Sequence, residues 1–378
     1  MELRIAVSEL TKTLNVMQGI AQRKNTMPIL ANVLLEAKNT SDGGHLTLSA
    51  TDLEIGMRVA EKCHVVEEGQ ITLTARALFD VIKMLSGPDV TIRYAPNEYV
   101  TIKSGRTNVK LLAFAADEFP RLPDFSATKF HDLEINKFVE MVQKTLYSTS
   151  MDENRYNLSG VYFEPQKQQP NKLVLVSTDG HRLSRIEKAF SDANFDSQIP
   201  TIFPKKGLSE LVKMLEGKQS AENPYFQLGF SGNQAIACYS NSVLTMRLID
   251  GKFPDYKQVI PNLSDKIIRA SRVDLFTSLR RVSVLSDDRN QSVKIVLRTG
   301  EMTISCANPE SGEISDDIAI EYSGPDMEMG FNVRYMIDAL SSMDENNIAM
   351  KITDSLSPAL LTGMNSDDHL CVVMPMRI

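Results

Sequence analysis

The sequence predicts an α+β protein built from three similar domains, each with two helices packed on one side of antiparallel sheets. Two observations support this prediction. A strand that ends in a polar turn occurs three times, and each occurrence is preceded and followed by the same order of strands and helices. Antiparallel sheets with one covered and one solvated face suit such alternating, turn-rich segments. We place the three domains at residues 1–127, 128–262 and 263–378.

The clearest copy of the repeated segment is residues 173–186, which read as two short strands around a tight turn. Leu-Val-Leu-Val at 173–176 is the aliphatic run of a buried strand, and Asp179-Gly180 provides the positive φ that a tight hairpin needs. Similar stretches lie at residues 46–52 and 302–308. In the third copy Asn308 replaces the aspartate, so this copy is the most divergent.

Other landmarks recur at nearly constant spacing. Thr51-Asp52 matches Thr178-Asp179 at an offset of 127, residues 83–85 match 213–215 at 130, and Phe119-Pro120 matches Phe253-Pro254 at 134. The gradual increase of this offset along the chain fits loop insertions of a few residues. The third copy continues through residues 334–340, which align with 206–212. Three copies of this kind imply three domains of one design.

Each copy opens with a strand, a capping residue and a helix. Ser8, Asn136 and Ser271 are the predicted N-caps, and apolar residues follow them at helical spacing. Each copy then has a second helix, and strands and turns fill the remainder. The predicted helices span residues 8–24, 75–85, 136–147, 205–215, 272–281 and 333–343.

Composition predicts a cytoplasmic protein without a resident metal or cofactor. Of the 378 residues, 42% are hydrophobic, and no apolar run approaches the length of about 18 residues that suggests a membrane span. The first residues alternate like a strand and lack a secretory signal pattern. The four cysteines and five histidines are too widely spaced to indicate disulfides or a zinc motif.

The net charge of −7 hides an uneven distribution. The six predicted helices carry 14 Lys or Arg against 6 Asp or Glu, a net charge of +8, whereas the rest of the chain carries −15. Lys and Arg often lie on the solvated faces of helices, which is one interpretation. If the three helix pairs stand side by side, their polar faces instead merge into a basic stripe that crosses phosphates without reading bases.

Four motifs carry a resemblance to a known family. They are Thr-Asp-Gly-His-Arg-Leu at 178–183, Asp-Gly-Lys-Phe-Pro-Asp-Tyr at 250–256, Gly-Phe-Asn-Val at 330–333 and Val-Val-Met-Pro-Met-Arg-Ile at 372–378. Together with the repeat, they make the whole chain resemble the bacterial sliding clamps, the beta subunits of the replicative DNA polymerase III holoenzyme. The resemblance implies three repeated clamp domains that form half of a closed ring.

The resemblance also implies a mechanical function without chemistry. A head-to-tail homodimer would encircle double-stranded DNA, with its helices lining the hole, and would tether the polymerase so that it cannot diffuse away. The chain has no Gly-x-x-x-x-Gly-Lys-Ser/Thr loop, so an ATP-driven clamp loader would open it. The partners implied are the replicative polymerase alpha subunit, the clamp loader, other polymerases, ligase and mismatch-repair proteins.

Partners of this family dock an extended peptide with Gln, Leu and Phe anchors into a pocket between the second and third domains. The matching positions here are Leu158, Thr178, Gly180, His181, Arg182, Leu183, Pro254, Val259, Asn332, Tyr335, Ser355, Val372, Val373, Met374, Pro375, Met376 and Arg377. Two positions depart from the family pattern: Gln258 replaces a basic residue, and the chain ends in Ile378 rather than Leu. Without the resemblance, residues 372–378 would read as an apolar terminal strand.

Contacts with DNA and between subunits follow from the charge pattern and from the resemblance. The expected DNA-binding residues are Arg23, Lys24, Arg76, Lys83, Lys137, Lys144, Arg155, Tyr156, Lys205, Lys206, Lys213, Arg280 and Arg281. Ring closure is expected to use Arg106, Val109 and Leu111 of one subunit against Val284 and Leu285 of the other.

Two rival functions remain open at this level. A small-molecule enzyme formed by domain triplication could use Asp179 and His181 as acid and base, although no nucleophile motif lies beside them. A static DNA-binding protein is the other rival, and it fits poorly with a net-acidic chain.

Overall fold

The computed structural model describes residues 1–21, 27–94, 98–123, 125, 127–191, 193, 195, 199–217, 223–261, 266–286 and 291–377. The chain forms two compact units. The first consists of Met1–Asn136 with Lys206–Leu248, and the second of Lys137–Lys205 with Ile249–Ile378. The central predicted domain therefore contributes to both units, and the domain limits at 127 and 262 stay a prediction.

An eight-stranded antiparallel sheet organises the first unit. Its strands in spatial order are β10 (Phe130–Glu134), β15 (Tyr225–Ser231), β16 (Gln234–Tyr239), β17 (Ser242–Arg247), β4 (Ile55–Lys62), β3 (Gly43–Thr51), β2 (Asn32–Thr40) and β6 (Gly69–Thr74). A five-stranded sheet contains β5 (His64–Glu67), β1 (Glu2–Ala6), β7 (Asp89–Tyr94), β8 (Tyr99–Ser104) and β9 (Thr107–Leu112). The pairing of β4 with β17 carries the larger sheet from the first predicted domain into the second.

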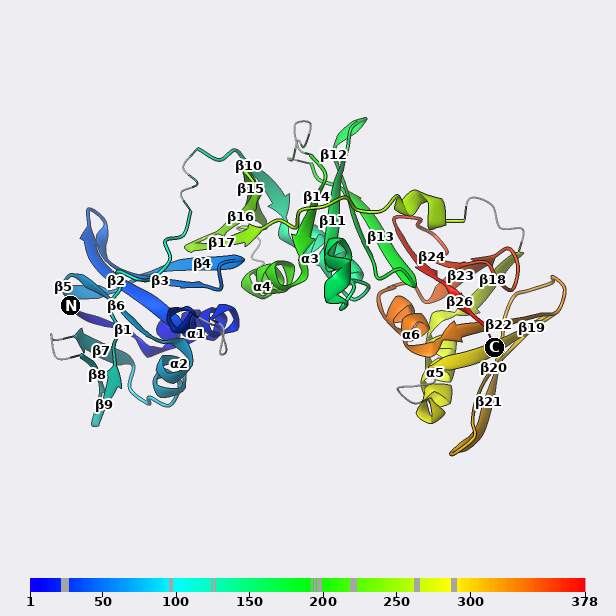
Figure 1. The fold of residues 1–378 in the computed structure, drawn as a ribbon, viewed down its shortest axis with the longest axis horizontal. Helices are drawn as coiled ribbons and strands as arrows, with labels where there is room; N and C mark the ends of the chain where they lie inside the picture. Colours follow the sequence, from blue (N-terminus) through cyan, green and yellow to red (C-terminus); the bar gives the residue numbers. More distant parts are fainter. Residues whose placement is uncertain are drawn as a thin grey trace. The chain divides into compact units, whose positions relative to one another are not determined.

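The helices of the first unit bury their apolar faces against these sheets. They are α1 (Val7–Ile20), α2 (Ala75–Lys83), α4 (Lys205–Leu215, of which Lys205 belongs to the second unit) and the short η1 (Pro28–Ala31). Leu10, Leu14 and Met17 of α1 are fully buried, as the helical spacing predicts. α1 and α2 lie side by side (Figure 1).

The second unit repeats the same plan. Its eight-stranded sheet runs β14 (Thr201–Pro204), β11 (Gly160–Gln166), β12 (Gln169–Thr178), β13 (Arg182–Ala189), β25 (His369–Val373), β24 (Ala359–Gly363), β23 (Asn347–Ile352) and β18 (Lys266–Ser271). A five-stranded sheet runs β21 (Gly312–Ala319), β20 (Glu301–Asn308), β19 (Ser292–Arg298), β22 (Met327–Asn332) and β26 (Pro375–Met376). The pairing of β13 with β25 carries the larger sheet from the second predicted domain into the third.

The helices of the second unit complete its core. They are α3 (Ile135–Leu146, of which the first two residues belong to the first unit), α5 (Arg272–Val282), α6 (Val333–Ser341), and the short η2 (Glu153–Leu158), η3 (Tyr256–Val259) and η4 (Ser283–Leu285). Leu279 of α5 and Met336 and Leu340 of α6 pack with Phe331 in one fully buried cluster. No helix among the described residues is long and apolar enough to span a membrane.

The repeated polar turn is present in all three copies. The side-chain oxygen of Asp52, Asp179 or Asn308 accepts the backbone N–H two residues later, at 3.0, 2.9 and 2.9 Å. This Asx turn makes the chain reverse direction between two strands. Asn308 also donates from Nδ2 to the carbonyl of Leu285 at 3.3 Å, which a carboxylate cannot do. That extra bond explains why asparagine suits the third copy.

Two of the three predicted N-caps are wrong. Ser8 and Asn136 lie inside α1 and α3, which begin one residue earlier, directly after a strand. Ser271 does cap α5, because its hydroxyl accepts the backbone N–H three residues later. In α1 the strand runs straight into the helix, so its first N–H is satisfied by the carbonyl of Pro88 at 2.9 Å instead of by a side chain.

Candidate functional site

A small apolar cavity lies in the second unit, where the β12–β13 turn meets β25. It has a volume of about 150 Å³ and is lined by Leu158, Thr178, Gly180, Arg182, Leu183, Pro254, Asp255, Tyr256, Val259, Val372 and Met374. Nine of these were expected from the resemblance, and Asp255 and Tyr256 were not. The cavity therefore draws together segments that lie up to 216 residues apart in the chain, from Leu158 to Met374.

The floor of the cavity is part of the eight-stranded sheet. Leu183 of β13 lies opposite Val372 of β25, and both side chains are almost fully buried. They belong to one apolar cluster with Val174 and Val176 of β12 and with Leu158 at the end of η2. Because hydrogen bonds between the strands fix the register, the apolar wall is held rigidly before any ligand arrives.

One side of the cavity is formed by the segment that follows β17. Phe253 stacks on Tyr162 of β11 with 4.7 Å between the ring centres. The hydroxyl of Tyr256 donates to Glu164 Oε2 at 2.5 Å, and burial followed by this carboxylate raises the pKa of the phenol. Gln258 is exposed and donates to Asp255 Oδ2 at 3.0 Å. Residues 253–256 are part of a motif used above, but spacing alone does not indicate the stacking that turns them toward the cavity.

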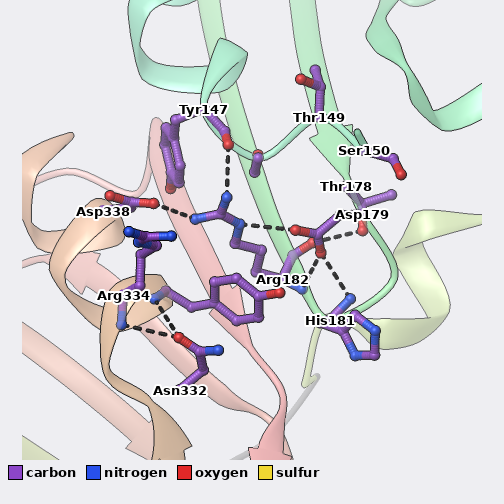
Figure 2. Close-up of polar contacts among 12 residues, drawn as sticks. Tyr147, Thr149, Ser150, Thr178, Asp179, His181, Arg182, Asn332, Arg334 and Asp338 are labelled. Carbon is purple, nitrogen blue, oxygen red and sulfur yellow. Dashed lines mark hydrogen bonds and ion pairs between the residues drawn. The ribbon is translucent and has the colours of Figure 1, made fainter. Parts of the chain in front are cut away.

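Arg182 holds the polar rim together (Figure 2). Its guanidinium contacts Asp179 Oδ2 at 3.0 Å and Asp338 Oδ2 at 2.5 Å, and it donates to the carbonyl of Tyr147 at 2.8 Å. The ring of Tyr335 lies 4.4 Å from its carbon Cζ. Burial alone would lower the pKa of this guanidinium, but the two carboxylates outweigh burial and raise it. Only 11% of the side chain is exposed, so the Arg182 cluster ties the β12–β13 turn to α3 and α6.

The other residues expected in the pocket do not line the cavity. His181 is exposed, and its ring lies nearly parallel to that of Tyr335 with 6.5 Å between centres. Asn332 caps α6 by accepting two backbone N–H groups. Of the rest, Val373 is buried in the sheet, Pro375 and Met376 pair with β22, and Ser355 and Arg377 are exposed.

Asp179 is occupied by structural contacts. Its carboxylate accepts hydrogen bonds from the backbone N–H groups of His181 and Arg182, at 2.9 and 3.0 Å, as well as from the Arg182 side chain. A general base needs an oxygen directed at a substrate. The pairing of Asp179 with His181 suggested by the sequence is thus a turn contact, and it lends no support to a catalytic site.

A buried polar network lies beneath the cavity floor. The Tyr147 hydroxyl is 3.2 Å from Cys371 Sγ, and the Ser184 hydroxyl is 3.2 Å from His369 Nε2 and donates to the carbonyl of Lys144 at 2.6 Å. Burial lowers the pKa of His369 to about 4 and raises the pKa of Cys371 and Tyr147. These groups are therefore neutral near pH 7, and they join α3 to β13 and β25 through hydrogen bonds.

Comparison with known proteins identifies the family. Three models of the DNA polymerase III beta subunit match in order: the N-terminal domain over residues 1–123, the central domain over 132–255 and the C-terminal domain over 257–377. The chain belongs to the DNA polymerase III beta subunit family. Members of this family are DNA sliding clamps, which are processivity factors and not enzymes, and this chain functions as a DNA sliding clamp.

Curated relatives and solved structures agree over the full chain. The beta sliding clamps of Pseudomonas putida and Escherichia coli K12 are 31% and 32% identical to it, each with 100% of both chains covered. The sliding clamp of Bartonella birtlesii, solved bound to griselimycin, has a TM-score of 0.92 at 31% identity, again with 100% of both chains covered.

In the first unit, the expected DNA-binding residues of this clamp mostly have polar or aromatic neighbours. Lys206 Nζ lies 2.5 Å from Asp52, Arg76 pairs with Asp80 at 2.8 Å, and Lys213 pairs with Glu210 at 2.8 Å. Lys83 lies over the ring of Phe79 on its own helix. Arg23 and Lys24 fall outside the described residues. Since Lys213 and Arg76 remain more than half exposed, their charge is still available to a nearby phosphate.

In the second unit, Lys144 differs from the other expected DNA-binding residues. Its side chain is only 13% exposed and contacts both Glu140, at 2.8 Å, and Asp344, at 2.6 Å. Such a buried, doubly paired ammonium has little charge left for a polyanion. Lys144 therefore reads as a structural residue that joins α3 to the end of α6.

The remaining candidates of the second unit lie closer to solvent. Arg281 pairs with Asp316 of β21 at 2.6 Å, and Arg280 lies over the ring of Phe276. Arg155 donates to the carbonyl of Asp179, and Lys137 donates to the carbonyl of Ala189. Tyr156 is 53% exposed. Lys205 lies near the sulfur of Met151.

The residues expected at ring closure lie at or beside free sheet edges. β9, with Val109 and Leu111 half-buried and Arg106 exposed in the preceding turn, is the last strand of one five-stranded sheet. β21 is the last strand of the other, and η4 lies against it. Within η4, Val284 is 77% exposed, whereas Leu285 packs on the core of the second unit.

Proposed function

We propose that this clamp acts as a closed homodimer around duplex DNA and tethers partner proteins through the cavity of the second unit. The observation that carries the proposal is the ordered match of all three family domains to a chain in which β9 and β21 are edge strands of the two five-stranded sheets. A closed ring attaches to DNA by topology, so it needs no tight contact with bases or phosphates. The net charge of −7 is compatible with such an attachment.

Topological attachment is tested by retention on DNA. The clamp is loaded by its clamp loader onto a nicked circle, the salt concentration is raised, and the circle is then cut once. We expect the protein to stay on the intact circle and to leave after linearisation, because a linear molecule has ends over which a ring can slide. Equal loss from intact and cut DNA would reject the ring.

The site of ring closure follows from the repeat. Within the chain, β4 of the first copy pairs with β17 of the second, and we call this pairing the first junction. β13 of the second copy pairs with β25 of the third, which is the second junction. The equivalent strand of the third copy is β21, and the first-copy strand equivalent to β17 is β9. Both are free edges with half-buried apolar side chains, which are natural pairing sites. The third junction thus joins β21 of one subunit to β9 of its partner.

The two junctions within the chain also support a register for the proposed third junction. Met57 lies opposite Leu244 in the first junction, and their equivalents are Ile314 and Val109. The resulting opposite pairs are Glu313 with Lys110, Ile314 with Val109 and Asp317 with Arg106. In this register the half-buried side chains share one face, and the exposed charges of opposite sign share the other. Opposite charges across strands stabilise each pair by about 0.2–1 kcal/mol.

A charge swap tests this register. One variant carries Arg106→Glu with Lys110→Glu, and the other carries Glu313→Lys with Asp317→Lys. Each homodimer then contains four like-charge pairs, which together cost about 2 kcal/mol and weaken the dimer roughly thirty-fold. We expect each variant alone to sediment as a monomer and an equimolar mixture to form dimers, since both interfaces of the mixed dimer are complementary. A mixture as weak as the separate variants would refute the register.

The cavity is suited to an extended peptide with apolar anchors. Leu183, Val372 and Met374 offer an aliphatic wall, and the exposed backbone of Gly180 and the carboxylate of Asp255 offer polar contacts at its rim. A cavity of about 150 Å³ holds one or two side chains, so the affinity is modest, about micromolar, or roughly −8 kcal/mol. Modest affinity lets the polymerase alpha subunit, clamp loader, other polymerases, ligase and mismatch-repair proteins exchange at one site.

Peptide titration tests the cavity. We expect a short peptide with Gln, Leu and Phe anchors to bind once per chain, and Leu183→Glu to abolish binding because it places a charge in the apolar wall. Met84→Ala, at a side chain that is 82% exposed in the first unit, is the matched control and leaves binding unchanged. Unaltered binding by Leu183→Glu would place the peptide elsewhere.

A further inference from the structure

The linker after β9 fills a space in the first unit that corresponds to the cavity of the second. A side-chain carbon placed on Gly56 of β4 would lie 2.3 Å from Leu122 Cδ2 and 2.8 Å from Thr245 Oγ1. Real carbon atoms do not approach so closely, so Leu122 occupies the volume that a side chain at position 56 would take. Glycine at position 56 is what allows the linker to lie directly on the sheet.

The repeat shows what this space corresponds to. Gly56 is the equivalent of Leu183, because each lies opposite the residue just before the Asx turn. Its neighbour across the junction, Thr245, is the equivalent of Val372. In the second junction Leu183 and Val372 line the open cavity. Leu122 therefore lies against the counterpart of the cavity wall.

The two linkers differ in what holds them. Leu122 aligns with Tyr256, since Phe119-Pro120 aligns with Phe253-Pro254. The Tyr256 ring is held at the side of its cavity by the hydrogen bond to Glu164, and the space beside it stays empty. Leu122 is aliphatic and has no such tether, and it inserts above the glycine. One linker thus forms a wall of a cavity, and the other fills the corresponding space.

We propose that the first junction is a second docking site for the same class of peptide, held closed by Leu122 as an internal ligand. The proposal rests on the proposed function of the cavity in the second unit. Leu122, a residue of the same chain, fills the first junction with an aliphatic side chain. In the second junction the corresponding anchor would come from a separate partner peptide. Each chain therefore offers one open site, and displacement of residues 119–123 would create a second.

Removal of the Leu122 side chain tests this proposal. Four chains are titrated with the peptide bearing Gln, Leu and Phe anchors: the unaltered chain, Leu183→Glu, Leu122→Ala and the double variant. We expect the unaltered chain to bind one peptide, Leu183→Glu none, Leu122→Ala two and the double variant one. The affinity of the new site should be about ten-fold weaker, because its linker must move aside. In the double variant, peptide should shift the amide resonances of Gly56 and Thr245. Met84→Ala is again the matched control.

The outcomes separate the two proposals. If the unaltered chain binds no peptide, the proposed function of the cavity fails. If it binds one and the folded double variant binds none, the internal-ligand proposal alone fails.

A second variant keeps the test decisive if Leu122→Ala does not fold. Gly56→Ala places a carbon atom 2.3 Å from Leu122 Cδ2, too close for both to stay, and should expel the linker. We expect trypsin to cleave after the neighbouring Arg121 about ten-fold faster in this variant, because an expelled segment opens more readily. Unchanged cleavage would show that Leu122 does not hold the linker closed, and would overturn the proposal.

Discussion

The two sheet junctions of this clamp share one frame and differ in what fills it. In both, a strand that follows an Asx turn pairs with a strand of the next copy. The first junction combines Gly56 with Leu122 and is closely packed. The second combines Leu183 with a tethered Tyr256 and is open. One glycine and one leucine thus account for the difference between a packed joint and a binding site on the same scaffold.

The helices beside the two junctions show the same contrast. Gly19 of α1 and Tyr147 after α3 are equivalent, as are Glu210 of α4 and Asp338 of α6. A side-chain carbon on Gly19 would lie 3.1 Å from Glu210, so the first junction needs a small residue there. In the second junction Arg182 contacts both Asp338 and the carbonyl of Tyr147. A large polar cluster in the second junction therefore takes the place of close helix packing in the first.

The largest expected effect comes from removing Arg182. Arg182→Ala leaves Asp179 and Asp338 without their shared cation, and loss of one partner from a mostly buried pair costs about 3 kcal/mol. Lys206→Ala is the matched change in the first junction; the Lys206 side chain is 42% exposed, so we expect a loss of about 1 kcal/mol. Urea unfolding measures both. Equal losses of unfolding free energy would show that the Arg182 and Lys206 ion pairs stabilise the two junctions equally.

The next largest expected effect is a dependence of stability on pH that comes from the second junction. His369, buried in the second, has its pKa lowered to about 4 by burial and then by Lys144, against the opposing influence of Asp344 and Glu140. The unfolded chain takes up this proton at an ordinary pKa of about 6.5 and the folded chain does not, so the stabilisation is complete above pH 6.5 and is lost as the pH falls toward 4.

The expected loss from His369 over that range is at most about 3 kcal/mol. His369→Gln should remove this part of the pH dependence of the unfolding free energy. His64→Gln, at an exposed histidine of β5, should leave it in place. A pH profile unchanged by His369→Gln would mean that other groups cause the acid destabilisation.

The smallest expected effect concerns the turns themselves. Leu53 has a φ of +77° where the equivalent Gly180 has +90°. A side chain is strained in this region, so Leu53→Gly should stabilise the fold by up to about 1 kcal/mol. Gly180→Ala should destabilise it by at least as much, because its new carbon would also lie 2.8 Å from Arg155 Nη1. Thermal unfolding measures the stability of both variants. Changes in stability of the same sign would contradict this account.

The repeat and the helices could be predicted from the sequence, because periodicity and turn chemistry are local signals. The limits of α4 agree with the prediction at both ends, and those of α2, α5 and α6 agree at the start. The start of α1 could not be predicted, since its first N–H is satisfied by Pro88, a residue far along the chain. Local sequence carries no signal for a cap of that kind.

The cavity was only partly predictable for the same reason. Nine of its lining residues were expected from the family resemblance. Asp255 and Tyr256 reach the cavity only because Phe253 stacks on Tyr162 and Tyr256 bonds to Glu164, contacts between distant segments. The position of Leu122 over Gly56 likewise depends on a linker that crosses a strand 66 residues earlier, which no spacing rule reports.

The proposed pairing of β9 with β21 also makes association of this chain directional. Because β9 and β21 are different surfaces, each copy in this proposal uses one strand to pair with the copy before it and the other to pair with the copy after it. Head-to-tail assembly of this kind ends only when the rotation between copies closes on itself, and otherwise grows into filaments. In the proposed assembly, the rotation between successive copies therefore decides whether the chain forms a finite particle or a fibre.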